Sequence, residues 1–237
     1  MTRSTDCVQT SGPMKLYGII FDVDGVIADS ESVNVRATAL AFEELFGLSD
    51  VRARDFEAGI GRGAEEYVRA GARAHGRELT AQEVAAGVKA RQDTFLRLLQ
   101  AEDLPAFPGV LGLIGAALED DSFCAAIATS STREKSGAVL SSARVPIERM
   151  VYVCGDDITR KKPDPEVFLL ACRRLGLPPV SCVVIEDAPN GVQAAHRAGC
   201  TCVAVTNTCP REALAAADLT VDSLEEVSLE IVARLLG

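Results

Sequence analysis

The feature that most constrains this chain is an apolar run that ends abruptly in two carboxylates and a glycine: residues 16–26 read LYGIIFDVDGV. Short apolar runs rich in β-branched and aromatic residues are typical of a strand that is covered on both faces. In open α/β sheets the carboxyl ends of such strands border the ligand crevice, so Asp22 and Asp24 are expected at a functional edge. Gly25 permits a positive φ and therefore a turn directly after the two acids.

Two acids separated by one residue project to the same side of an extended chain. Each carboxylate then makes it harder for the other to ionise, unless a cation lies between them. The pair formed by Asp22 and Asp24 therefore favours a divalent metal. The alternative is ordinary turn chemistry after a strand, where Asp and Gly are common for conformational reasons alone.

Length and charge exclude several classes of protein. The chain has 237 residues, which is enough for one α/β domain and a smaller second one. Its net charge of −10 disfavours nucleic acid as a partner, because that binding depends on clustered Lys and Arg. No apolar stretch is long enough to span a membrane, and the N-terminal residues lack the pattern of a signal peptide. We therefore expect a cytoplasmic protein without a membrane partner.

The cysteines and histidines argue against two further kinds of site. The eight cysteines are expected to be reduced thiols that pack as small hydrophobic residues, because nothing marks the chain as secreted. Cys200 and Cys202 are the only close cysteine pair, and His75 and His196 are the only histidines. A zinc site or a histidine-based catalytic triad is therefore not expected.

The order of periodic segments predicts two domains. Residues 1–13 are polar and aperiodic and are expected to form a mobile tail, with Met14 as an alternative start. Helical patterns then follow one another without a strand until a break rich in proline and glycine at residues 104–109. They run from the capping residues 29–31 to Gly47, from about Ala64 to His75, and from Thr80 to Ala101. We predict a core domain of residues 14–29 and 105–237, and an inserted all-helical cap of residues 30–104.

Beyond the break, short apolar runs alternate with helical patterns. This alternation predicts a Rossmann-like α/β core, with a parallel sheet and right-handed crossovers. The expected strands are Phe123–Ala128, Val151–Cys154, Cys182–Ile185 and Thr201–Val205, with helices such as Pro165–Leu175 and Gly191–Ala198 between them. The alanine-rich residues 213–217 are read as a segment that favours a helix.

Several of the expected strands are followed by polar residues. Thr129, Ser130 and Ser131 offer hydroxyl and backbone N–H groups that suit a phosphate oxygen, although plain helix capping is the alternative. Lys162 lies in a loop that two prolines stiffen, with a solvated lysine as the alternative. Glu186 and Asp187 are adjacent acids, which repel each other at a sheet edge without a cation.

These groups together favour phosphoryl transfer. Mg²⁺ prefers oxygen ligands and is commonly held by a few carboxylates together with a substrate phosphate. An aspartate can act as a covalent nucleophile by forming an aspartyl phosphate. The acids, the hydroxyl groups and the single lysine provide all the groups that this chemistry requires.

Four ordered motifs resemble those of the haloacid dehalogenase superfamily: DVDG at residues 22–25, TS at 129–130, KPDP at 162–165 and EDAPNG at 186–191. They look like the branch that contains β-phosphoglucomutase and the CbbY-like phosphatases, which carries a helical cap after the first motif. The resemblance covers the chain from Lys15 onward, and four motifs in order are far more specific than any one alone.

The resemblance implies a role for each motif residue. Asp22 would attack phosphorus and ligate Mg²⁺, while Asp24 would act as general acid and then general base, with its backbone carbonyl at the metal. Thr129 would bind the transferring phosphoryl oxygens, and Lys162 would balance negative charge. Metal binding would be completed by Asp187, with Glu186 beside it.

The predicted cap supplies the expected substrate contacts. By similarity, the glycine-rich loop at residues 59–63 matches the specificity loop of this branch, where Arg62 would grip a second acidic group. Arg91 lies near a basic position of the mutase, and residues 131–133 would face the same side by similarity. Ser130 and Ser131 are included among the expected substrate contacts. The loop arginine could equally face solvent.

One departure from the pattern bears on the reaction. Asn34 stands where the mutase-like pattern has a histidine that communicates with the general acid, and this favours hydrolysis. We expect a monomeric, Mg²⁺-dependent phosphatase acting on a small phosphomonoester such as a sugar phosphate. The first alternative is a phosphosugar mutase, and the second is a non-catalytic signalling module that resembles a receiver domain. Asp24 argues against both dehalogenation and phosphonate cleavage.

Overall fold

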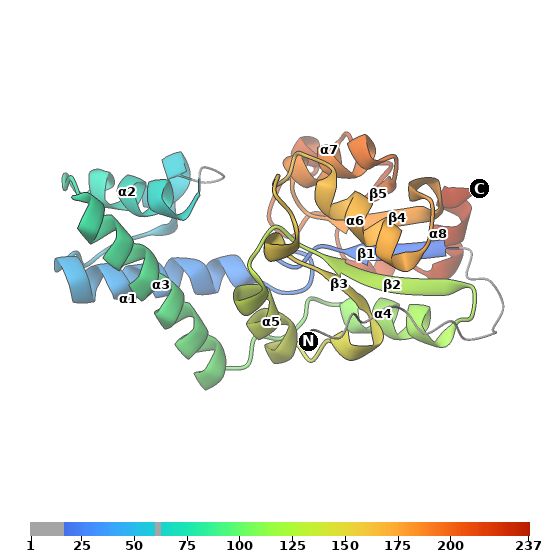
Figure 1. Cartoon of the computed structure of the whole chain (residues 1–237), viewed down its shortest axis with the longest axis horizontal. Coiled ribbons are helices and arrows are strands. Elements are labelled where there is room, and N and C mark those ends of the chain that lie inside the picture. Colours follow the sequence, from blue (N-terminus) through green and yellow to red (C-terminus); the bar gives the residue numbers. More distant parts are fainter. Residues whose placement is uncertain (1–16, 60–62) are drawn as a thin grey trace, which may run out of the picture. The chain divides into compact units, whose positions relative to one another are not determined.

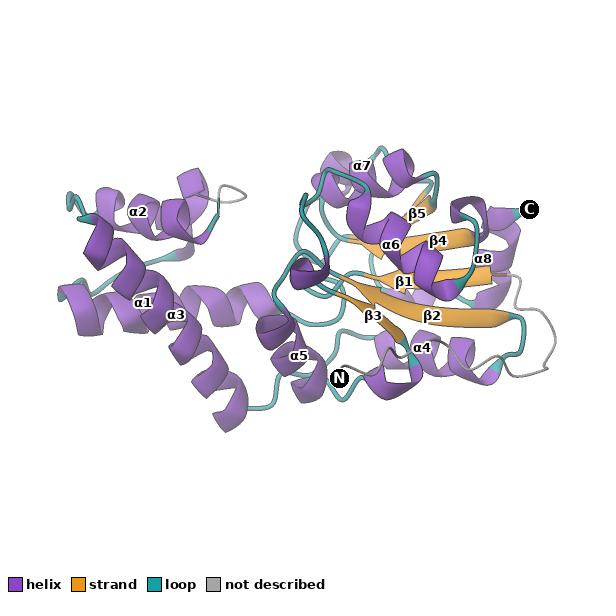
Figure 2. Cartoon of the chain, in the orientation of Figure 1, coloured by secondary structure: helices purple, strands orange, loops and turns teal. Residues whose placement is uncertain are grey.

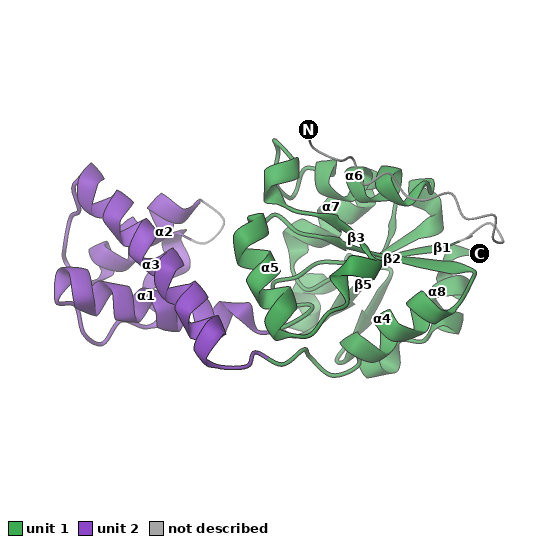
Figure 3. Cartoon of the chain, turned by 60° about the horizontal axis from the view of Figure 1, so that its bottom comes forward, with its two compact units in different colours: residues 1–28, 105–237 green, residues 29–104 purple. Residues whose placement is uncertain are grey.

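The computed structural model describes residues 17–59 and 63–237. The predicted tail at residues 1–13 and the predicted contact Arg62 lie outside the described residues. The described part of the chain divides into two compact units, shown in two colours in Figure 3. One comprises residues 17–28 and 105–237, and the other comprises Asp29–Leu104. The predicted domain limits remain our interpretation of the sequence.

The first unit is built on a six-stranded sheet in which every described neighbouring pair is parallel. The strand order is β3-β2-β1-β4-β5-β6, so the strand that precedes the two acids lies near the middle. The strands are β1 (Tyr17–Phe21), β2 (Phe123–Ala128), β3 (Val151–Val153), β4 (Cys182–Glu186), β5 (Thr201–Val205) and β6 (Leu219–Val221). The α/β fold with a parallel sheet, predicted from the sequence, is confirmed.

Helices cover both faces of this sheet (Figures 1 and 2). On one face, α6 (Glu166–Leu175) packs on β1, β2 and β3, and α7 (Pro189–Ala198) packs on β4 and β5. On the other, α4 (Val110–Glu119) packs on β2, and α8 (Leu229–Leu236) packs on β4. The helix α5 (Arg133–Ser142) follows β2. Because the central strands are covered twice, their side chains are almost entirely buried, as the continuous apolar runs predict.

The strand register brings the ends of β1, β2 and β4 together. Phe21 pairs with Ile127 on one side and with Ile185 on the other, so the next residue of each strand lies at the same sheet edge. The chain turns immediately after β1: Gly25 has a φ of 81°, and its N–H donates to the carbonyl of Ala28 at 3.1 Å. The glycine therefore allows the turn that keeps the two acids at this edge.

The second unit is helical throughout its described regular elements, which confirms the inserted helical region. It contains α1 (Ser30–Phe46), the 3₁₀ segment η1 (Ala53–Gly59), α2 (Ala64–Ala74) and α3 (Ala81–Ala101). The elements pack α1 against α3 and α2 against η1. At its apolar centre, the rings of Phe56 and Tyr67 stack with centroids 4.5 Å apart. Thr80 and Glu83 form a reciprocal capping box at the start of α3.

Two details of the C-terminal part differ from the sequence-based expectations. The alanine-rich residues 213–217 do not form an α-helix: the 3₁₀ segment Arg211–Leu214 stops at Leu214, the only buried residue among its four. The strand β6 was not predicted from the sequence, because three residues are too few to show periodicity. Within the described residues, the structure contains no helix with the length and apolar character needed to cross a membrane.

Candidate active site

Three buried carboxylates meet at the carboxyl edge of the sheet. Asp22 directly follows β1, Glu186 is the last residue of β4, and Asp187 comes next in the chain. One carboxylate oxygen from each lies within 4.8 Å of the others. The three residues are only 7%, 1% and 5% exposed, so their negative charges are close together and largely shielded from water.

A buried lysine lies between two of these acids. Lys162 Nζ donates to Asp22 Oδ1 and to Glu186 Oε1, each at 2.6 Å. Its side chain is 7% exposed, and the ammonium lies 4.7 Å from the ring centroid of Phe168 on α6. The loop that the prolines were predicted to stiffen therefore places a buried positive charge at the carboxyl edge of the sheet. The alternative of a solvated loop lysine is wrong.

Burial and mutual repulsion perturb the acids strongly. The pKa of Asp22 is raised to about 7, chiefly by burial and also by the Glu186 and Asp24 carboxylates, against the lowering effect of Lys162. Burial also raises the pKa of Asp187 to about 8, assisted by Glu186 and Asp22. Burial alone would lower the pKa of Lys162, but the charges of Asp22 and Glu186 raise it. The site therefore lacks the positive charge needed for all three acids to ionise easily.

Glu186 is fixed by the backbone of the turn into α7. Its Oε2 accepts hydrogen bonds from the N–H groups of Asp187 at 2.9 Å and Ala188 at 3.1 Å. A Cβ at Gly191 would lie 1.8 Å from Glu186 Oε1, so only glycine leaves room for this carboxylate. The glycine of the EDAPNG motif thus has a packing reason, and Glu186 is held in place to bind Lys162.

The Asp24 carboxylate is not one of the three acids of this cluster. The resemblance to the family implies a different contact for this residue, between its backbone carbonyl and the metal. The Asp24 carboxylate accepts a 2.5 Å hydrogen bond from Ser131 Oγ and a 3.2 Å hydrogen bond from Lys135 Nζ on α5. Its side chain is 32% exposed, far more than that of Asp22. Its partners therefore hold the second acid of the motif toward the loop after β2.

The hydroxyl groups after β2 occupy different positions. Thr129 is buried, and its Oγ1 accepts a hydrogen bond from the N–H of Ser131 at 3.1 Å. Within the described residues, Ser130 Oγ is buried and has no hydrogen-bond partner. The predicted anion cradle is thus a tight turn at the end of β2, in which Ser131 contacts Asp24.

Within the helical unit, Arg91 belongs to a polar network. Its Nη2 donates to Asn34 Oδ1 at 3.2 Å, and its guanidinium lies 4.5 Å from the ring centroid of Tyr67. Asn34 in turn donates to Glu31 at 3.2 Å, and Tyr67 donates to the same carboxylate at 3.4 Å. Both ends of the Asn34 amide therefore have partners inside this unit.

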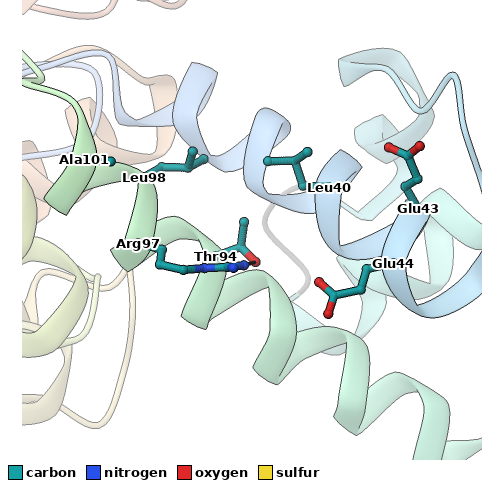
Figure 4. Close-up of a pocket in the computed structure, with 7 residues that line it drawn as sticks. All are labelled: Leu40, Glu43, Glu44, Thr94, Arg97, Leu98 and Ala101. Carbon is teal, nitrogen blue, oxygen red and sulfur yellow. Dashed lines mark hydrogen bonds between the residues drawn. The ribbon is translucent and has the colours of Figure 1, made fainter.

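A hollow of about 480 Å³ also lies in the helical unit, between α1 and α3 (Figure 4). Its lining combines apolar and charged side chains, among them Leu40, Leu98, Ala101, Glu43, Glu44 and Arg97. None of the described residues predicted for the site lines this hollow. It therefore lends no support to the catalytic assignment.

The cluster of acids has the donor chemistry for a divalent metal. Carboxylate oxygens are the ligands that Mg²⁺, Ca²⁺ and Mn²⁺ prefer, and a thiolate or imidazole is absent from the three-residue cluster. A cation at this position would offset the repulsion that raises the pKa values of Asp22 and Asp187. The residues therefore fit a divalent ion.

Three residues near the site were missed by sequence reasoning. Lys135 contacts Asp24, Asn207 Nδ2 donates to the carbonyl of Gly25 at 2.8 Å, and Thr208 Oγ1 donates to Asp187 Oδ2. Asn207 and Thr208 follow β5 in the same way that other polar residues follow β2 and β4. The sequence analysis looked for polar residues after the other predicted strands. The same search after the predicted strand Thr201–Val205 would have identified Asn207 and Thr208.

Comparison with known proteins agrees with this fold. A family model described as haloacid dehalogenase-like hydrolase matches residues 19–205. The chain therefore belongs to the haloacid dehalogenase-like hydrolases. Its relatives further place it in the branch of CbbY-like and β-phosphoglucomutase-like proteins with a helical cap. The family suggested by the four sequence motifs is confirmed.

The curated relatives of this chain include proteins that are named as phosphatases. Validoxylamine A 7'-phosphate phosphatase of Streptomyces hygroscopicus subsp. limoneus is 33% identical over 88% of this chain and 94% of its own length. Hexitol phosphatase A of Escherichia coli is 30% identical over 91% and 95%. The predicted class of enzyme, a hydrolase of the haloacid dehalogenase family, agrees with the family that the chain belongs to.

Other similarities define how far the match extends. CbbY from Rhodobacter sphaeroides, crystallised with phosphate, has a TM-score of 0.79 and 28% identity, and the match covers 92% of this chain and 99% of that one. A mutant of the same protein was crystallised with xylulose-(1,5)bisphosphate. The chain spans 18% of the length of SUPPRESSOR OF QUENCHING 1 of Arabidopsis thaliana, which is 33% identical over 82% of this chain. It spans 61% of the length of a CBBY-like protein of that plant.

Proposed function

We propose that this protein is a Mg²⁺-dependent phosphatase that hydrolyses a small phosphomonoester of the sugar phosphate class through an aspartyl phosphate on Asp22. One observation carries the proposal: Lys162 joins Asp22 to Glu186 at 2.6 Å each, with Asp187 in the same buried cluster. Such a cluster provides a nucleophile, a fixed positive charge and ligands for a hard cation at one point. Phosphoryl transfer requires this combination of positioning and charge.

In this proposal, Asp22, Asp187 and the backbone carbonyl of Asp24 hold Mg²⁺, with Glu186 fixed behind them. When bound, the ion neutralises negative charge on the phosphoryl oxygens. Lys162 favours the ionised form of the Asp22 carboxylate and holds it in place through its short hydrogen bond. Because its ammonium is buried, the attraction is screened less than that of a surface pair.

In the first step, a carboxylate oxygen of Asp22 attacks phosphorus, and the ester P–O bond breaks. Asp24 gives its proton to the departing oxygen, which leaves as an alcohol. In the second step, water attacks the phosphorus of the aspartyl phosphate, Asp24 takes the proton of that water, and inorganic phosphate leaves with Asp22 restored. Asp24 suits this exchange of protons because it is the more exposed acid of the motif.

Hydroxyl and arginine side chains are assigned to substrate binding. Thr129 binds the transferring phosphoryl oxygens, and Ser130 and Ser131 extend this contact through the turn after β2. The orphaned hydroxyl of Ser130 supports its assignment, because a buried hydroxyl gains from a substrate acceptor. Arg62 and Arg91 are assigned to the distal part of the substrate.

Hydrolysis is favoured over mutase activity by the environment of Asn34. An amide cannot relay a proton as a histidine does, and both ends of this amide are hydrogen bonded within the helical unit. The proposed class of substrate is supported by relatives that are named for the phosphate esters of validoxylamine A and of hexitols. A bisphosphate bound to a third relative is consistent with an additional cationic contact.

The test measures phosphate release from a panel of sugar and polyol phosphates, with and without Mg²⁺. β-Glucose 1-phosphate is included, with a coupled assay for glucose 6-phosphate. We expect Mg²⁺-dependent release without isomerisation. Isomerisation without release would establish the mutase, and a long-lived phosphorylated protein in intact-mass spectra would establish the receiver-like alternative.

The nucleophile is tested separately with Asp22→Asn. This variant should fold normally and lose all turnover, whereas Glu119→Gln, at an acid whose side chain is 74% exposed, should retain full activity. The role of Asp22 as nucleophile is decided by single-turnover measurements, with enzyme in excess over substrate. Phosphate release by Asp22→Asn under these conditions would disprove covalent catalysis through this residue.

A further inference from the structure

The loop that follows β5 contacts two separate parts of the acidic site. Thr208 Oγ1 donates to the carboxylate oxygen Oδ2 of Asp187 and lies 3.1 Å from the Asp187 carbonyl. The neighbouring Asn207 Nδ2 donates to the carbonyl of Gly25 at 2.8 Å, in the turn that follows Asp24. Two adjacent residues of this loop therefore hold the turn after β1 and the acid after β4.

Gly25, Asp187 and Thr208 are packed so closely that no side chain fits at position 25. A Cβ at Gly25 would lie 2.0 Å from Asp187 Oδ2 and 2.8 Å from Thr208 Cγ2. The three residues are thus in direct contact, although they come from three segments of the chain. The Asp187 oxygen Oδ2 is therefore confined between the backbone of Gly25 and the side chain of Thr208, which both lie against it.

We propose that Thr208 is a positioning residue that orients the Asp187 carboxylate toward a divalent cation. A hydroxyl that holds one carboxylate oxygen leaves the other oxygen to act as the ligand. Carboxylates that bind metals are commonly held by a hydrogen bond of this kind, and loss of such a partner weakens metal binding. The inference rests on the proposed function, because it requires Asp187 to be a metal ligand.

The loop offers matched variants for a test. Thr208→Val removes the hydroxyl and keeps the shape, whereas Thr208→Ser keeps the hydroxyl. Thr206→Val is the control, because Thr206 lies in the same loop but donates to Asp222, away from the acidic cluster, at 2.8 Å. The dissociation constant for Mg²⁺ is measured by isothermal titration calorimetry on the full chain, without substrate.

We expect Thr208→Val to bind Mg²⁺ about 10–100-fold more weakly than the unaltered protein. Thr208→Ser should stay within about threefold of it, because the donor is kept. Thr206→Val should bind Mg²⁺ unchanged. Should Thr208→Val fail to fold, Thr208→Ala provides the same comparison.

The outcomes separate this inference from the proposed function. If the unaltered chain binds no Mg²⁺ and hydrolyses no phosphomonoester, the proposed function fails and the inference falls with it. If it binds Mg²⁺ and Thr208→Val binds as tightly, the inference alone is overturned. Equal weakening in the Val and Ser variants also overturns it, because the hydroxyl would then not be the cause.

Discussion

Removing divalent metal should make the stability of this protein fall as pH rises through neutrality. The perturbation is EDTA at pH values from 5 to 8. In the metal-free protein, burial raises the pKa of Asp22 to about 7 and that of Asp187 to about 8. A carboxyl whose pKa is raised on folding holds its proton more tightly in the folded state. It therefore contributes stability that is complete below the unfolded pKa of about 4 and is lost as pH rises through the folded value.

The size of the effect follows from the pKa shift. One carboxyl costs about 1.4 kcal/mol of unfolding free energy for each pH unit within this window. The charge of Asp22 is one cause of the raised pKa of Asp187, so the two shifts are not independent. We therefore count one acid, which gives a loss of about 3 kcal/mol between pH 5 and pH 7. For a chain of this size the melting temperature should then fall by roughly 6–12 °C. Acids with lowered pKa values, such as Asp157, are already ionised there and do not oppose the trend.

The assay is thermal denaturation followed by circular dichroism, in EDTA and in excess Mg²⁺. Bound Mg²⁺ should raise the melting temperature and flatten its pH dependence, because the ion binds the ionised acids of the folded state. The variant Asp187→Asn should show a smaller fall in EDTA. A metal-free melting temperature that stays constant or rises from pH 5 to pH 7 would refute the reasoning, since Lys162 would then offset both acids.

Two further changes test the packing and the capping. Gly191→Ala places a Cβ 1.8 Å from Glu186 Oε1, so it should lower the free energy of unfolding by about 1–3 kcal/mol and remove most of the activity. Gly137→Ala is the matched control, because a Cβ there meets open space in α5. It should instead raise the free energy of unfolding by up to about 1 kcal/mol. Urea denaturation of both variants gives the comparison, and equal effects would argue against a steric cause. Thr80→Ala removes the capping box of Thr80 and Glu83 and should lower the stability of the helical unit by about 1 kcal/mol with kcat unchanged, as checked by denaturation and kinetics.

The sheet and the acids could be predicted because both depend on local pattern. A strand buried on both faces must be apolar throughout, so the run before Asp22 and the run before Glu186 are visible in the sequence. The parallel arrangement then fixes where their ends meet. The positions of Asp22, Glu186 and Asp187 at one edge follow from that arrangement, whereas the 2.6 Å contacts of Lys162 require the structure.

The strand pattern could have placed Thr208 near the site, but the particular contacts of such side chains join distant segments and are not encoded in any local pattern. Thr208 is 21 residues from Asp187 in the chain, and Lys135 is 111 residues from Asp24. For the alanine-rich residues 213–217, the sequence predicted a helix that the structure does not contain. Their intrinsic preference for a helix was not matched by an apolar face that packing could stabilise. Local preference is informative only where tertiary contacts agree with it.

The charge of the buried cluster explains why metal and lysine are both needed. Three carboxylates and one ammonium leave two negative charges when all groups ionise, which is the charge that one divalent cation neutralises. Lys162 alone therefore cannot balance the site, and this uncompensated charge adds to the burial that raises the pKa values of Asp22 and Asp187. With a divalent ion, Asp22 can remain a carboxylate near neutral pH, which is the form that attacks phosphorus. In the proposed mechanism, a divalent metal and the lysine would thus act on the same property, the ionisation of Asp22.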